Sequence, residues 1–229
     1  MVGSEFTNLL TRILPVALKL SRVVAGIPMK KIVACLLITF GFVSLAYAAG
    51  DAAAGKDKTA MCSGCHGADG NSVVGSFPKL AGQGERYLIK QMNNVKSGER
   101  VIPEMMGILD NSSDQDIADM AAYYASQAIT IGAANPDLVE VGEMLYRAGN
   151  AAKGIAACAA CHSPTGVGNA QAGFPALGGQ HADYTIKQLK AFRGGMRAND
   201  DAMVMRQVAA LLSDKEIEAV ASYIQGLSK

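Results

Sequence analysis

Two short stretches of the chain carry the same cluster of reactive side chains, a Cys-x-x-Cys-His motif. They lie at residues 61–70, MCSGCHGADG, and at residues 156–166, AACAACHSPTG. The motif residues are Cys62, Cys65, His66, Cys158, Cys161 and His162. The chain has 229 residues, five cysteines and three histidines, so the motifs use all of these side chains except Cys35 and His181. Thiols and imidazoles in such a pattern bind a metal, exchange disulfides or attach a cofactor.

The first two of these chemistries lack the surroundings that they need. A structural zinc site takes four ligands. Residues 49–131 offer no Cys or His beyond the first motif, so zinc would have to bridge both motifs. A redox-active dithiol belongs after a strand in a thioredoxin-like fold, whereas the sequence around both motifs reads as helical. A dithiol would also give no role to a histidine at the same position in each motif.

Covalent attachment of haem accounts for all three residues of the motif. Cysteines at i and i+3 project from one side of a helical turn, so that both can form thioethers with the vinyl groups of one haem. The adjacent histidine marks this kind of attachment and supplies an axial nitrogen to the iron. We therefore predict two haem c groups, one held by Cys62, Cys65 and His66 and the other by Cys158, Cys161 and His162.

The sequence repeats itself well beyond the two motifs. FPKLAGQGERYLIKQM at 77–92 matches FPALGGQHADYTIKQL at 174–189, and SSDQDIADMAAYYASQ at 112–127 matches LSDKEIEAVASYIQGL at 212–227. Two copies of a unit of this size indicate two similar domains rather than a solenoid. We predict domain 1 at 49–131, a linker at 132–138 that contains Gly132 and Pro136, and domain 2 at 139–229.

Each copy has the periodicity of helices. Ser213 and Glu216 form a Ser-x-x-Glu capping box, and Ser113 with Asp116 is its weaker relative. Apolar residues follow both at helical spacing, and further helices are expected at about 84–96 and 181–193. No stretch alternates every two residues, so the predicted fold class is all-α, with two tandem helical domains. Small domains commonly need a stabilising element beyond their hydrophobic core, and a haem inside each domain would provide it.

The repeat also selects a second axial ligand for each iron. His181 aligns with Gly84, so it cannot be a ligand that both copies share. Met105 and Met205 each stand eight residues before the serine that begins the last helix, and no other pair of methionines coincides in this way. We predict these two as the ligands, in loop-like stretches, with Met106 and Met203 as the nearest rivals. Iron with histidine and methionine ligands has a raised potential and no open position for a substrate.

These residues resemble the bacterial dihaem cytochrome c4 family over essentially all of 49–229. The resemblance implies a pair of class I cytochrome c domains whose haems approach each other at the domain interface, and axial methionines at Met105 and Met205. It also implies that the carbonyls of Pro78 and Pro175 accept the N–H of the haem histidines. Tyr87 and Tyr184 repeat as well, and would reach haem propionates or simply pack.

The same resemblance implies a role and partners. Members carry electrons from the cytochrome bc1 complex toward terminal oxidases, often of the cbb3 type, and are periplasmic or peripherally membrane-associated. The chain is thus expected to be an electron carrier rather than an enzyme, with no small-molecule substrate. Two alternatives stay open: an electron-accepting subunit of a dehydrogenase, and a dihaem peroxidase, which would need a haem with a displaceable ligand.

The first 48 residues have the features of a targeting segment. Residues 29–48 combine Lys30 and Lys31, an apolar run and an Ala-Tyr-Ala end, which together predict a cleaved signal peptide and a periplasmic location. Residues 1–28 do not fit that pattern and are interpreted as an upstream extension that arises from the choice of start codon. An uncleaved segment would instead serve as an anchor, although its apolar run is shorter than the ~20 residues of a spanning helix.

Charge is distributed unevenly between the two halves of residues 49–229. Residues 49–140 hold seven Lys and Arg against twelve Asp and Glu, a balance of −5, and residues 141–229 hold nine against seven, a balance of +2. No basic cluster of the kind that nucleic-acid binding requires is present. The opposite signs give the molecule a dipole that can orient a docking partner.

Overall fold

The computed structural model describes residues 49–228, so the predicted signal peptide and upstream extension lie outside the described residues. Within 49–228 the regular structure is helical, and two isolated β-bridges take the place of strands. The first copy contains α3 (Ala52–Lys58), α4 (Ser63–His66), α5 (Glu85–Ser97), the 3-10 helix Pro103–Met105 and α6 (Asp114–Ala125). The second contains α7 (Pro136–Ala148), α8 (Ala159–His162), α9 (Ala182–Arg193), α10 (Val204–Ala210), α11 (Asp214–Gly226) and the 3-10 helices Ala151–Lys153 and Asp201–Met203. In this part of the chain, no helix is both long enough and apolar enough to cross a membrane.

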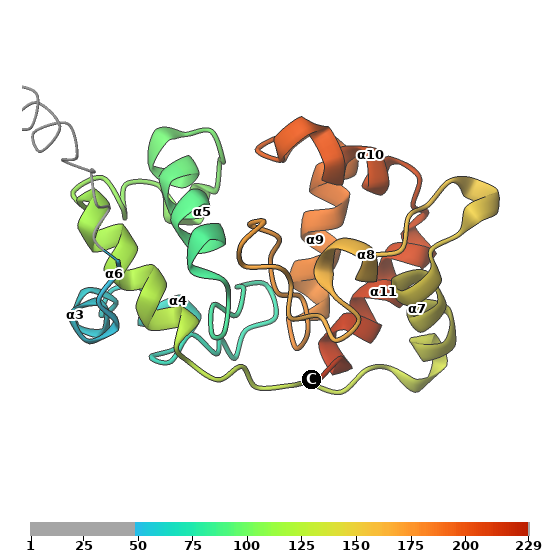
Figure 1. Cartoon of the computed structure of the whole chain (residues 1–229), viewed down its shortest axis with the longest axis horizontal. Helices are drawn as coiled ribbons and strands as arrows, with labels where there is room; N and C mark the ends of the chain where they lie inside the picture. The colour runs from blue at the N-terminus through green and yellow to red at the C-terminus, as the bar shows by residue number, and fades with distance from the viewer. Residues whose placement is uncertain (1–48, 229) are drawn as a thin grey trace, which may run out of the picture. The chain divides into compact units, whose positions relative to one another are not determined.

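The first and last helices of each copy pack against each other. In Figure 1, α3 lies beside α6 in the first copy, and α7 lies beside α11 in the second. Glycines permit the close approach, because a Cβ on Gly55 would lie 2.0 Å from the Asp119 carbonyl oxygen and one on Gly142 would lie 2.3 Å from that of Ala219. The two crossings are built alike, as expected for two copies of one unit.

The helical periodicity of the last helices is confirmed by their burial. The apolar residues that follow the two capping serines at helical spacing are all buried, and they are Ile117, Met120, Ala121, Tyr124, Ile217, Val220, Ala221 and Ile224. In the first copy they pack with Leu88 and Leu109, and Cys62 lies against the same cluster. In the second copy Val220 and Ile224 pack with Leu145 and Tyr146, and Cys158 lies against them. The haem motifs therefore border the core of each copy.

The last three residues of the predicted linker belong to a helix. Helix α7 begins at Pro136, three residues inside the predicted linker, and Asn135 caps it by accepting the Asp137 N–H. Proline suits the first position of a helix, since the N–H that it lacks would have no partner there. Pro136, which the sequence placed in the linker, is therefore the first residue of a helix.

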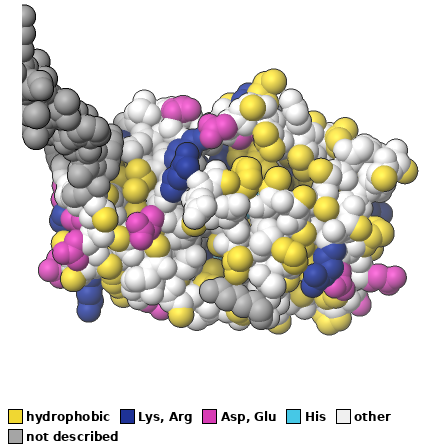
Figure 2. Space-filling model, in the orientation of Figure 1, with side chains coloured by type: hydrophobic (Ala, Val, Ile, Leu, Met, Phe, Trp, Pro, Cys, Tyr) yellow, Lys and Arg dark blue, Asp and Glu magenta, His cyan; other side chains and the backbone are white. Residues whose placement is uncertain are grey.

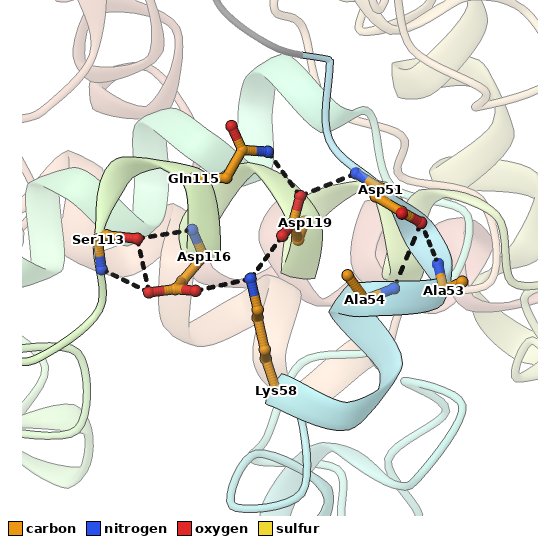
Figure 3. A network of polar contacts seen from close by, with 8 residues as sticks. All are labelled: Asp51, Ala53, Ala54, Lys58, Ser113, Gln115, Asp116 and Asp119. Carbon is orange, nitrogen blue, oxygen red and sulfur yellow. Dashed lines mark hydrogen bonds and ion pairs between the residues drawn. The ribbon is translucent and has the colours of Figure 1, made fainter.

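Both predicted capping boxes are present, and one of them belongs to a larger network. Ser113 and Asp116 cap each other's backbone N–H groups, as do Ser213 and Glu216. Lys58 joins Asp116 at 2.6 Å and Asp119 at 2.5 Å (Figure 3). Asp119 also accepts the Asp51 N–H at 2.8 Å, although its own side chain is nearly fully buried. This network ties α3 and the residues before it to α6.

We predict that the network makes the attachment of α3 sensitive to acid. Hydrogen bonds from the Asp51 N–H and from Lys58 lower the pKa of Asp119 from 3.8 to about 2. Because the charged form is favoured in the folded protein, this stabilisation is complete above about pH 4 and is lost as the pH falls through about 2. The thermal unfolding midpoint of the holoprotein should fall over this window, and Asp119→Asn should flatten the dependence. Asp57→Asn, an exposed change on the same helix, is the control, and an equal response from both variants would contradict the prediction.

Candidate haem sites

Each Cys-x-x-Cys-His motif forms one helical turn with the same hydrogen bonds. The His66 N–H donates to the Cys62 carbonyl at 2.9 Å, and the Cys65 N–H donates to the same oxygen at 3.2 Å. The second motif repeats both bonds at the same lengths, from His162 and Cys161 to the Cys158 carbonyl. In each copy the turn places both sulfurs and the imidazole of a motif along one short helix, which is the donor set that covalent haem attachment needs.

A proline carbonyl orients each of the two histidines. Nδ1 of His66 lies 3.0 Å from the Pro78 carbonyl oxygen, and Nδ1 of His162 lies 2.9 Å from that of Pro175. Burial lowers the pKa of both imidazoles, against the opposing effect of these carbonyls. A neutral imidazole that donates from Nδ1 leaves the lone pair of Nε2 for a metal, and the bond to the carbonyl fixes the ring and raises its basicity.

The first cysteine of each motif is a poor thiolate. Burial raises the pKa of Cys62 and raises that of Cys158 to about 11. Reactive dithiols act as thiolates, so this environment does not favour that chemistry. Among residues 49–228, no group of three or more His, Cys, Asp or Glu side chains gathers where a metal ion could bind.

Met105 and Met205 are half-buried, whereas the rival methionines beside them are exposed. Met105 ends a 3-10 helix and packs against the core of the first copy, and Met205 is half-buried as well. Their rivals face solvent, since 76% of Met106 and 49% of Met203 is exposed. An axial ligand has to point inward, so burial favours the pair that the repeat selected.

Met205 differs from the expectation in its local structure. The sequence placed both methionines in loop-like stretches, but Met205 lies in the seven-residue helix α10. The turn before that helix is strained, because Ala202 and Met203 both have positive φ angles, 51° and 59°. Asp200 holds the far side of the turn by accepting Arg206 N at 3.0 Å and Arg206 Nε at 2.7 Å.

The two copies meet through a cluster of polar side chains related by the repeat. Arg100 donates to the Tyr184 hydroxyl at 2.9 Å, and Arg197 donates to the Tyr87 hydroxyl at 3.0 Å. Arg100 also donates to Gln91 at 2.9 Å and to Gln188 at 3.0 Å. Arg197 likewise donates to Gln188 at 2.8 Å and to Gln91 at 3.0 Å. Tyr87 and Tyr184, predicted to contact propionates or to pack, thus bind the arginine of the other copy.

The arginine pair is short of negative charge. Arg100 and Arg197 are 8% and 9% exposed, and neither forms an ion pair with a carboxylate of the described residues. Burial alone would raise the pKa of the Tyr87 phenol, but the two guanidiniums hold it below its ordinary value. Buried cations require anionic partners, and haem propionates carry that charge. The donor sets and this charge deficit together fit two haem groups.

Comparison with known proteins agrees with this arrangement. The sequence model of the cytochrome c family matches residues 52–128 and again 142–228. A cytochrome c4 of Pseudomonas aeruginosa is 60% identical over 200 residues, which cover 87% of this chain and all of the relative. The chain belongs to the cytochrome c4 family. A crystal structure of reduced recombinant cytochrome c4 from Pseudomonas stutzeri aligns with a TM-score of 0.77 and 57% identity, over 78% of this chain and all of that one.

A more distant relative carries a different name. A thiosulfate dehydrogenase electron acceptor of Stutzerimonas stutzeri is 37% identical over 182 residues, which cover 76% of this chain and 83% of the relative. As a cytochrome c4, the chain has two tandem helical cytochrome c domains and two covalently bound haem c groups, and it transfers electrons rather than catalysing a reaction. The predicted fold class, cofactors and absence of an enzymatic role are confirmed by these relatives.

The surface of this cytochrome c4 shows no single field of one charge on the face drawn in Figure 2. Lys and Arg side chains are scattered there and lie near Asp and Glu side chains. Ion pairs also join the two copies, since Lys90 binds Asp201 at 2.5 Å and Lys187 lies 3.6 Å from Glu104. Each pair connects a helix of one copy with the methionine-bearing segment of the other.

His181 has a structural place in this cytochrome c4. Its Nε2 lies 2.8 Å from the Ser72 carbonyl of the other copy, and its backbone begins helix α9. Sequence reasoning excluded it as a ligand that both haems share, but it did not find this interdomain contact.

Several polar residues of the interface escaped the sequence reasoning. These are Gln83, Gln91, Arg100, Gln180, Gln188 and Arg197. A signal for them exists, because each member of the first copy has an identical residue 97 positions later. A buried polar side chain that repeats outside a haem motif marks the interface between the copies.

Proposed function

We propose that the two haem irons are bound by His66 with Met105 and by His162 with Met205, and that the protein is a one-electron carrier between larger complexes. The observation that carries this proposal is the equivalence of the two sites, each with an Nδ1-anchored histidine and a half-buried methionine. With both axial positions filled, neither iron offers a place for peroxide or another substrate. The bound haem supplies the electron, and the chain sets the potential through its ligands and charges.

The partners that we propose are the cytochrome bc1 complex as donor and a terminal oxidase of the cbb3 type as acceptor. The compartment is the periplasm, with peripheral attachment to the membrane. This is supported by the cytochrome c4 relatives and by the signal-like composition of residues 29–48. Uneven charge between the copies supports it as well, since a dipole orients a carrier that must present its haems to two different complexes.

A redox titration of the purified holoprotein, with optical detection of the methionine-to-iron charge-transfer band, tests the ligation. Two positive potentials and a band from each haem are expected. A strongly negative potential or a high-spin component would show that a methionine assignment is wrong. Stopped-flow mixing with reduced bc1 complex and with cbb3 oxidase then tests the partners, and turnover too slow to support respiration would remove them from the proposal.

One observation favours a second candidate function. The relative from Stutzerimonas stutzeri is named as a thiosulfate dehydrogenase electron acceptor and matches most of this chain. The same two haem sites would then receive electrons from a dehydrogenase. Adding thiosulfate and purified thiosulfate dehydrogenase to the oxidised holoprotein distinguishes the two, because rapid reduction of the haems is expected only for the dehydrogenase acceptor.

We predict that the haem of the second copy has the higher reduction potential. Reduction adds a negative charge, which costs more in the first copy than in the second. Residues 49–131 hold seven Lys and Arg against ten Asp and Glu, a balance of −3, whereas residues 132–229 hold nine of each, a balance of 0. The effect is small because exposed charges are screened by salt. Redox titration of the Met105→His and Met205→His variants assigns each potential to its haem, and a higher potential for the first haem would reverse the order.

A further inference from the structure

The peptide that anchors each haem histidine is also bound by a glutamine from the other copy. The carbonyl of the peptide between Pro78 and Lys79 accepts His66 Nδ1–H. The N–H of that same peptide, on Lys79, donates to Gln180 Oε1 at 2.9 Å. Gln180 completes the pair by donating from Nε2 to the Lys79 carbonyl at 2.9 Å. The histidine of the first copy is therefore two hydrogen bonds from a side chain of the second.

The reverse connection is built in the same way. The carbonyl of the peptide between Pro175 and Ala176 accepts His162 Nδ1–H. The Ala176 N–H donates to Gln83 Oε1 at 2.8 Å, and Gln83 Nε2 donates to the Ala176 carbonyl at 2.9 Å. Two crossed contacts with matching atoms and lengths occur at positions that the repeat makes equivalent.

Both glutamines are held in place by their own copy. Each is 7% exposed, and each Oε1 also accepts the next backbone N–H of its own chain segment, Gly84 or His181, at 3.0 Å. Gly84 and His181 are the N-cap residues of helices α5 and α9. Since every polar atom of the two amides has a partner, the glutamines cannot turn away without leaving buried groups unpaired.

A hydrogen bond to a peptide N–H strengthens the same peptide's carbonyl as an acceptor. Hydrogen bonds in a chain polarise one another, by perhaps 10–30% per bond. A stronger acceptor draws the imidazole proton closer, which gives the ring more imidazolate character and makes Nε2 a better donor to iron. A more basic ligand favours the oxidised iron, so each glutamine should lower the potential of the haem in the opposite copy.

We propose that Gln180 tunes the first haem and that Gln83 tunes the second, through the two proline peptides. This rests on the proposed ligation by His66 and His162. The glutamines are positioning residues, since they act on the histidines through a peptide and touch no haem ligand themselves. Docking of the copies then sets both potentials, because separation of the copies removes both contacts at once.

The test is to replace each glutamine by methionine in the holoprotein, Gln180→Met and Gln83→Met, and to measure both potentials by spectroelectrochemistry. Gln180→Met should raise the potential of the first haem, with about a twofold increase in its reduced-to-oxidised ratio at fixed ambient potential, about 18 mV. Gln83→Met should do the same to the second haem. In each variant, the potential of the haem in the copy that carries the substitution should change less.

The control variant is Arg86→Met, which removes a contact across the same interface, from Arg86 Nη1 to the Gln171 carbonyl at 2.6 Å, without touching either proline peptide. It should shift neither haem selectively. Small-angle scattering reports whether the copies stay docked in each variant. NMR of the histidine Nδ1 protons in the reduced protein adds a second readout, and the His66 proton should move upfield in Gln180→Met.

A crossed pattern, with the larger shift in the opposite copy, supports the relay. Shifts in the variant's own copy, equal shifts of both haems, or no shift while the copies remain docked would overturn it. The methionine charge-transfer bands separate this outcome from failure of the proposed function. If both bands persist and the pattern is not crossed, the relay alone is wrong, whereas missing bands in the unmodified protein reject the ligation.

Discussion

Met205→His lowers the reduction potential of the second haem by a few hundred millivolts and abolishes its methionine charge-transfer band. Axial ligation sets haem potentials over a range of about 0.8 V, and a methionine ligand raises the potential relative to a second histidine. The first haem keeps its band and shifts little, because its proposed ligand, Met105, lies in the other copy. Redox titration followed at the two haems measures both effects in one sample.

The neighbouring methionine provides the control. Met203→Leu changes an exposed side chain two residues away and should leave both bands and both potentials nearly unchanged. The opposite result, in which Met203→Leu removes the band and Met205→His does not, would mean that the strained turn at residues 202–203 places Met203 at the iron. The repeat would then have selected the wrong residue.

The second large effect is expected at the buried arginine pair. Replacing both residues, Arg100→Met and Arg197→Met, should lower both reduction potentials. A buried positive charge favours the reduced haem, with interactions on the order of 1–2 kcal/mol per charge at an effective dielectric constant of about 20, or about 40–85 mV. Spectroelectrochemistry at low and high salt checks this, and the shift should persist at high salt because buried charges are poorly screened.

The Arg86→Met variant again serves as the control, since it removes one arginine charge at an exposed position of the same interface. Its effect on the potentials should be small and should vanish at high salt. Unchanged potentials in the double variant would mean that the guanidiniums have only a structural role. They would then serve only to join Tyr87 and Tyr184 to Gln91 and Gln188.

Much of the fold could be predicted because its signals are local. The Cys-x-x-Cys-His spacing defines one helical turn, and Ser213 with Glu216 forms a capping box whose two bonds lie within four residues. The inward face of α6 follows from periodicity alone, since burial at a spacing of 3.6 residues needs no knowledge of the partner helix. The repeat then transferred each of these conclusions from one copy to the other.

What the sequence did not reveal depends on contacts between distant segments. Arg100 and Tyr184 are 84 residues apart, and only docking of the two copies places them at 2.9 Å. The helical setting of Met205 depends on the turn that Asp200 and Arg206 hold, and the first copy has no such pair at the equivalent positions. Pro136 was assigned to the linker because proline is common both after the end of a helix and at its first position. Asn135, which caps α7, shows that Pro136 occupies the first position of a helix.

The close crossing of first and last helices also determines the order in which the chain can fold. Helix α3 has seven residues, and isolated helices shorter than about 12–15 residues are barely stable in water. It becomes stable only when α6 has been synthesised and packs on Gly55, some 60 residues later in the chain. Until then the intervening Cys62 and Cys65 belong to an unfolded segment. A chain delivered from its N-terminus thus keeps the two thiols of the first motif accessible for haem attachment until α6 has arrived.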